Sequence, residues 1–139
     1  MTREKLEAYR SMKEEITEMK NRLRHLGEGD SMIGSSVVND YRSGYPVPQA
    51  VVGVDWARID RLKTRYERRI LELEKECAEI EEFIEDISDS MIRRIFRMYF
   101  FDGMSQKAVG TAIHMDRSRV SRKIDDFLKN AHKTQKAQL

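Results

Sequence analysis

Cysteine is almost absent from this sequence, because Cys77 is the only one. A single thiol cannot form a disulfide within the chain, and it cannot supply the paired cysteines of a structural zinc site. Chains without disulfides are typical of reducing compartments. We therefore expect an intracellular protein with neither a disulfide framework nor a structural metal.

Long apolar runs are also missing. No segment approaches the roughly 18 consecutive apolar residues that a membrane-spanning helix requires. The N-terminus does not show the apolar core of a signal peptide. These absences predict a soluble, cytoplasmic chain without a membrane partner.

No catalytic constellation is visible. The three histidines, His25, His114 and His132, are far apart in the sequence, and no G-x-x-x-x-G-K-S phosphate loop occurs. The acidic cluster within residues 79–86 fits a solvated helix face. We therefore expect neither an enzyme nor a cofactor.

Proline occurs twice in 139 residues, whereas charged residues make up 36% of the chain. This composition suits long exposed helices in one or two small domains. The net charge of +2 conceals an asymmetry, since residues 88–139 hold 11 Lys and Arg against 5 Asp and Glu, and residues 1–87 hold 15 against 19. A basic C-terminal part predicts an anionic partner there.

Residues 103–130 contain the most informative pattern. Ser105 is a good helix N-cap, and small apolar residues follow it at helical spacing up to Ile113. His114-Met115-Asp116 interrupts the pattern, and Asp116 is a second N-cap, whose charge suits the start of another helix. Two short helices joined by about three residues predict a helix-turn-helix.

The second of these helices has two unlike faces. Val120, Ile124, Phe127 and Leu128 share one side, whereas Ser118, Arg119 and Arg122 lie opposite in the first two turns. A recognition helix presents its side chains to the major groove of duplex DNA from that position. The candidate DNA-binding residues are Arg117, Ser118, Arg119, Ser121, Arg122 and Lys123, with Ser105, Gln106 and Lys107 from the first helix. The alternative is a solvated face with an Arg122–Asp126 pair.

Residues 1–87 predict a helical hairpin and an oligomerisation domain. Helices are expected over about 4–26 and 55–87, the second capped by Asp55, because apolar residues repeat there at heptad spacing. The predicted seams contain Tyr9, Met12, Ile16, Met19, Leu23 and Leu26 in the first helix, and Trp56, Ile59, Lys63, Tyr66, Ile70, Leu73, Cys77, Ile80, Ile84 and Ile87 in the second. The helices can pair as an antiparallel coiled coil within one chain, between chains, or both, so a homo-oligomer is expected.

Three further segments complete the prediction. Residues 27–54 contain five glycines and both prolines, and are expected to form a loop, either a flexible connector or a docking element, in which VPQAVVGV is a candidate extended piece. A helix to Phe101, with Ile92, Ile95, Phe96 and Tyr99 inward, completes a helix-turn-helix domain over 88–130. Residues 131–139 are expected to be a flexible tail.

The order of these segments resembles the RinA/ArpU-type late-transcription activators of phages that infect Gram-positive bacteria. The FIEDISDS run and the GSS loop contribute to the resemblance, and the helix-turn-helix is similar to region four of bacterial sigma factors. His114 departs from the sigma-like pattern, which has Gly there, although His tolerates the left-handed conformation better than most residues. The resemblance implies DNA reading by Ser118, Arg119 and Arg122, and recruitment of host RNA polymerase in a bacterial cytoplasm.

The predicted fold class is all-α, and the predicted function is sequence-specific binding of duplex DNA by a phage or prophage transcriptional regulator that activates late genes. Two alternatives remain open. A small terminase-like subunit would join a similar helix-turn-helix to an oligomerising part and bind packaging DNA. A coiled-coil protein–protein adaptor would use the helical hairpin, and its basic end would be incidental.

Overall fold

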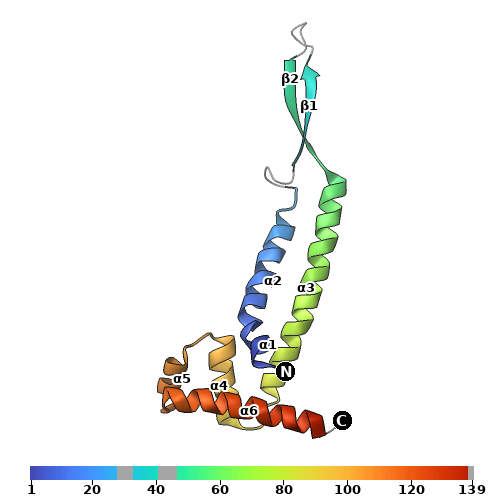
Figure 1. The fold of residues 1–139 in the computed structure, drawn as a ribbon. Helices are drawn as coiled ribbons and strands as arrows, with labels where there is room; N and C mark the ends of the chain where they lie inside the picture. The colour runs from blue at the N-terminus through green and yellow to red at the C-terminus, as the bar shows by residue number, and fades with distance from the viewer. Residues whose placement is uncertain (28–32, 41–46, 138–139) are drawn as a thin grey trace. The chain divides into compact units, whose positions relative to one another are not determined.

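The computed structural model describes the backbone of residues 1–27, 33–40 and 47–137, and the side chains of residues 1–27 and 55–133 (Figure 1). The chain divides into two compact units. Unit 1 contains Met1–Glu15 and Leu73–Leu139, and unit 2 contains Ile16–Glu72. Two helices, α2 and α3, each contribute residues to both units.

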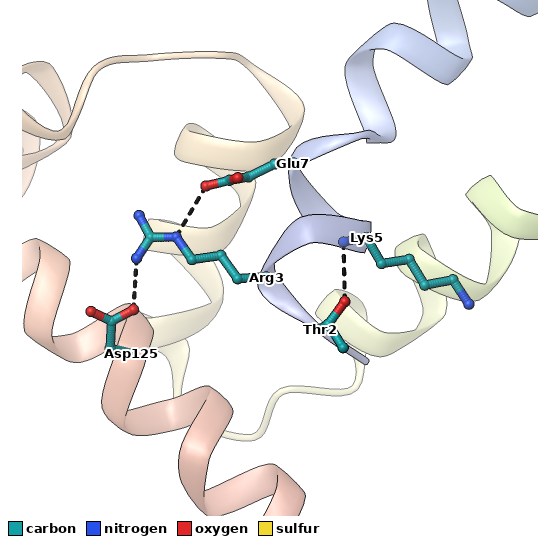
Figure 2. A network of polar contacts seen from close by, with 5 residues as sticks. All are labelled: Thr2, Arg3, Lys5, Glu7 and Asp125. Atoms are coloured by element: carbon teal, nitrogen blue, oxygen red, sulfur yellow. Dashed lines mark hydrogen bonds and ion pairs between the residues drawn. The ribbon is translucent and has the colours of Figure 1, made fainter.

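Unit 1 is helical. It contains α1 (Arg3–Glu7), the start of α2 (Tyr9–Arg24) and the end of α3 (Trp56–Glu85). These are followed by α4 (Ser90–Phe96), the π-helix η2 (Arg97–Phe101), α5 (Gln106–Ile113) and α6 (Arg117–Ala137). Two N-caps fix the helix starts, since Thr2 accepts a hydrogen bond from the Lys5 amide and Asp89 accepts from the Met91 and Ile92 amides (Figure 2 shows the first).

The core of unit 1 is apolar and draws on each of its helices. Phe127 of α6 packs edge-on against Phe96 of α4, with ring centroids 5.2 Å apart, and against Phe83 of α3 at 6.1 Å. The side chains with less than 2% exposure are Leu6, Leu73, Ile80, Ile84, Ile95, Phe96, Val109, Val120 and Ile124. Burial on this scale is the main source of stability in so small a unit.

The N-terminal segment is part of this core. Leu6 is completely buried, and the Tyr9 ring lies 4.7 Å from the Phe101 ring. The Tyr9 hydroxyl donates to Glu81, and burial together with that carboxylate raises the pKa of Tyr9 well above its ordinary value. The predicted domain boundary at residue 88 therefore does not coincide with the compact unit, which also includes residues 1–15 and 73–87.

Unit 2 contains the end of α2, a two-stranded ribbon and the start of α3. Strands β1 (Ile33–Asp40) and β2 (Val47–Val54) pair antiparallel, from Ile33 opposite Val54 to Asp40 opposite Val47. The prediction of a loop over 27–54 was therefore wrong for these sixteen residues. VPQAVVGV is extended, as suggested, and it forms the second strand.

Helix ends in unit 2 follow their sequence signals. Gly27 has a φ of +90° just after α2, a conformation that costs glycine little. Asp55 accepts a hydrogen bond from the Arg58 amide and starts α3, as predicted. Ile16, Ile59 and Ile70 are buried, whereas Trp56 is 68% exposed although it was placed in the seam. Lys63 is exposed, so its ammonium group stays in contact with water although the residue was placed in the seam.

Outside the ribbon the described chain is helical, as the all-α prediction requires, but several helices differ in detail. The predicted helix 4–26 is two helices, α1 and α2, which meet at Ala8. The helix predicted to end at Phe101 becomes a π-helix after Phe96, which shifts its phase by one residue and buries Phe100 while Tyr99 stays half-buried. Helix α6 continues to Ala137, so residues 131–137 are helical where a flexible tail was predicted.

No helix in the described residues is both long enough and apolar enough to cross a membrane.

Candidate nucleic-acid interface

Helix α5 is capped at its start and is followed by a tight turn. Ser105 accepts a hydrogen bond from the Ala108 amide at 3.1 Å, which confirms its predicted role as N-cap. Helix α5 ends at His114, whose φ of 56° and ψ of 47° place it in the left-handed region. The amides of His114 and Met115 both donate to the Gly110 carbonyl, so this single acceptor closes the turn.

Gly110 permits this closure because it lacks a side chain. A Cβ atom at residue 110 would overlap the Met115 carbonyl oxygen, which is backbone and cannot rotate away. Gly110 is itself buried. The turn between α5 and α6 is therefore fixed by a close backbone approach that only glycine allows.

We expect the Gly110→Ala variant to be destabilised by about 1–3 kcal/mol, because the backbone must move to admit the methyl group. The direction of the change in unfolding free energy decides the test. Helix propensity alone would make the alanine variant more stable than wild type by about 1 kcal/mol. Urea unfolding measures the change. Thr111→Ala is the control, because Thr111 is the exposed neighbour and its loss should change stability by less than about 0.5 kcal/mol. A Gly110→Ala midpoint at or above that of wild type would contradict the close approach.

Helix α6 begins directly after this turn. The Asp116 carbonyl accepts from the Arg119 amide at 3.0 Å and from the Val120 amide at 3.1 Å. The Asp116 carboxylate accepts from the Ser118 hydroxyl at 2.7 Å. Asp116 therefore occupies the predicted capping position, and its negative charge lies at the positive end of the α6 dipole.

The predicted faces of α6 are confirmed. Val120, Ile124 and Leu128 are buried, and Phe127 is half-buried against Phe96. Of the candidate residues on this helix, Arg117, Ser118, Arg119 and Arg122 are exposed, whereas Ser121 and Lys123 are half-buried. The apolar face packs onto α4 and α5, whereas the basic face is exposed.

The start of α5 lies beside the first turns of α6. A shallow groove of about 580 Å³ is lined by Gln106, Asp116, Arg117, Ser118, Ser121 and Arg122. Lys107 and Arg117 line an adjoining hollow of about 600 Å³. Arg119 and Lys123 line neither, and the hydroxyl of Ser105 is occupied by capping. Thus the structure brings together most of the residues that the sequence analysis selected.

One of the two acidic residues of α6, Asp125, has its charge offset within the chain. Asp125 pairs with Arg3 at 2.6 Å, which offsets its charge (Figure 2). The Arg122 Nε atom donates to the Ser118 carbonyl at 3.3 Å instead of forming the alternative pair with Asp126. Within the described part of the chain, the terminal nitrogens of Arg122 make no hydrogen bond. This guanidinium keeps donors for an external acceptor.

Two of the three arginines of α4 and η2 have structural partners. Arg93 donates to the Ile87 carbonyl at 2.7 Å, and Arg97 binds both carboxylate oxygens of Glu85. The hydrogen bonds from Arg97 lower the pKa of Glu85 below its ordinary value. Arg94 is exposed. The side chains of Arg93 and Arg97 are therefore engaged within the protein.

The sequence analysis did not predict the role of Arg3. Its guanidinium bonds both Glu7, at 3.0 Å, and Asp125 (Figure 2), and lies 5.9 Å from the centroid of the Tyr99 ring. Partial burial acts to lower the pKa of Arg3, but hydrogen bonds with Tyr99, Glu7 and Asp125 outweigh it and raise that pKa. No local signal in the sequence marks a contact between residues 122 positions apart.

No family model, curated protein or solved structure matches the chain. Among the described residues, no group of three or more His, Cys, Asp or Glu side chains could hold a metal ion.

Proposed function

We propose that the chain is a sequence-specific duplex DNA-binding regulator of transcription, of phage or prophage origin, and that α6 is its recognition helix. The observation that carries this proposal is the division of α6 into two faces. Val120 and Ile124 are fully buried on one side, while Arg117, Arg119 and Arg122 are exposed at the helix start. The first turns of a recognition helix contact base edges.

The chemistry of these side chains fits the major groove. Arginine reads guanine through two parallel hydrogen bonds to O6 and N7, and serine accepts or donates to either base of a pair. Arg119 and Arg122 are the proposed base-reading residues. Ser118, in the first turn of α6, is proposed to contact the DNA beside them. The proposal assigns phosphate contacts, which position the protein without reading sequence, to Gln106 and Lys107 at the start of α5 and to Lys123.

The proposal extends to assembly and regulation. The heptad pattern over 59–87 supports a coiled-coil hairpin whose remaining apolar surface is covered by a second copy. A homo-oligomer would bring two basic domains to one site and raise the apparent affinity. The resemblance to RinA/ArpU-type activators and to sigma region four supports activation of late genes, with host RNA polymerase as a partner in the bacterial cytoplasm.

Selection of bound fragments from a phage genome by the full-length protein tests the function. Enrichment of one site upstream of a late operon is the expected result. Enrichment of a packaging site would instead favour a terminase-like subunit, and recovery of fragments without any preference would favour a protein–protein adaptor. Sedimentation of the same sample tests the assembly, where a monomer at micromolar concentration would contradict the homo-oligomer.

A further inference from the structure

Helix α3 is strongly asymmetric in charge. Its first part, residues 56–72, contains six Lys and Arg against three Asp and Glu, whereas residues 73–85 contain one against six. The basic part belongs to unit 2 and is separate in sequence from the candidate interface of α5 and α6. The net charge of residues 1–87 is negative, so this basic segment is not evident from the overall composition.

Three arginines of this segment form one stripe. Arg61, Arg65 and Arg68 follow the spacing i, i+4 and i+7, which places them within about 60° of one another around the helix. All three are exposed, and they line a shallow hollow of about 420 Å³ together with Asp60 and Thr64. The stripe consists of Arg61, Arg65 and Arg68, and we call it the α3 arginine stripe.

The charges of the stripe are not neutralised within the chain. In the part that the structure describes, no acidic side chain pairs with Arg61, Arg65 or Arg68. Glu72, one turn beyond the stripe, pairs with Arg69 on a neighbouring line of the helix at 3.3 Å. Asp60 is the one carboxylate that lines the hollow. Three unpaired guanidinium groups against one carboxylate leave a positive surface.

We propose that the α3 arginine stripe is a second contact surface for duplex DNA, which binds the phosphate backbone and does not read sequence. This inference rests on the proposed function, because it assigns a further part of the chain to the same ligand. Arg61 and Arg68 are about 10 Å apart along the helix axis. Successive phosphates of one strand rise by about 3.4 Å, so the stripe spans about three phosphate steps.

The residue type also favours phosphate. The guanidinium group presents a rigid fork of donors that binds two phosphate oxygens at once, and it is weakly hydrated compared with an ammonium group. Thr64 offers a hydroxyl donor in the same hollow. An acidic surface on a second copy of the chain is the other occupant that these charges would attract, and the experiment below separates the two.

The test compares two full-length variants of equal charge. The stripe variant has Arg61→Gln, Arg65→Gln and Arg68→Gln. The control has Arg22→Gln, Arg24→Gln and Lys63→Gln, which are exposed in the same unit, and Lys63 lies about 160° around α3 from Arg61. Each is titrated with the duplex chosen by fragment selection and with a scrambled duplex of equal length, between 50 and 200 mM salt.

The expected result is a loss of affinity of about tenfold or more for both duplexes in the stripe variant, with the preference between them unchanged. The slope of log K against log salt is negative, and its magnitude should decrease by about 2.7, because three phosphate contacts contribute about 0.9 each. The control should change by less than about threefold.

If the stripe variant binds both duplexes as tightly as the control does, the stripe is not a contact surface for DNA. The proposed function of the chain would be unaffected by that result. A stripe variant that binds DNA normally but sediments as a smaller species would also overturn it, in favour of contact with a second copy. A wild-type protein that binds neither duplex would overturn both proposals.

Discussion

Replacement of Val120 by aspartate is expected to unfold unit 1. Val120 is completely buried in α6, and α6 packs on both α4 and α5. An unpaired carboxylate there costs several kcal/mol to bury, and no described side chain on the apolar face of α6 can pair with it. Small domains are stable by only about 5–15 kcal/mol, so this cost consumes much of the total.

Circular dichroism during thermal unfolding measures the effect. We expect the Val120→Asp variant to lose its cooperative transition or to unfold many degrees below wild type. Lys129→Asp is the matched control, because it introduces the same residue on an exposed position of the same helix and should have a small effect. Equal transitions in the Val120 variant and in wild type would show that the face assigned to the core is wrong.

Combined substitution of Arg119 and Arg122 by alanine is expected to remove most of the preference for the native DNA site. Each base-reading arginine contributes about 1–3 kcal/mol, which corresponds to roughly 5- to 150-fold in affinity. If the two contributions add, the double variant loses between about 25-fold and 10⁴-fold. Both side chains are exposed, so the fold should be retained.

The matched control is the double variant Arg94→Ala and Lys129→Ala, which removes two exposed charges outside the first two turns of α6. Titration with the native and the scrambled duplex separates reading from simple attraction. A uniform loss on both duplexes would assign Arg119 and Arg122 to phosphate contact. Unchanged binding of the native site would remove α6 from the reading role altogether.

Local patterns predicted the starts of α5 and α6 and the buried face of α6. The positions of Ser105 and Asp116 mark helix starts through chemistry that lies within one turn, and the apolar spacing from Val120 to Leu128 fixes the buried face of α6. The left-handed conformation of His114 was anticipated from the pattern in which glycine is usual. Signals of this kind act over three or four residues, so they are readable without knowledge of the fold.

Features that depend on distant partners were not predicted. The pairing of β1 with β2 depends on how two separate segments align, which a local pattern does not show. The abundance of glycine and proline in residues 27–54 indicated a loop instead. The π-helix at Arg97–Phe101 shifts the buried phase, so Phe100 replaces Tyr99 in the core. Trp56 continues the heptad spacing and yet is exposed, because spacing alone does not specify where the partner helix ends.

The ion pair between Arg3 and Asp125 has a consequence for the order of events during synthesis. Asp125 is synthesised 122 residues after Arg3. At about 5–20 residues per second, that interval is on the order of 6–24 s. During this time the apolar side chain of Leu6, which is completely buried in the finished protein, has no access to its full set of neighbours. Unit 1 can therefore complete its folding only after α6 has been synthesised.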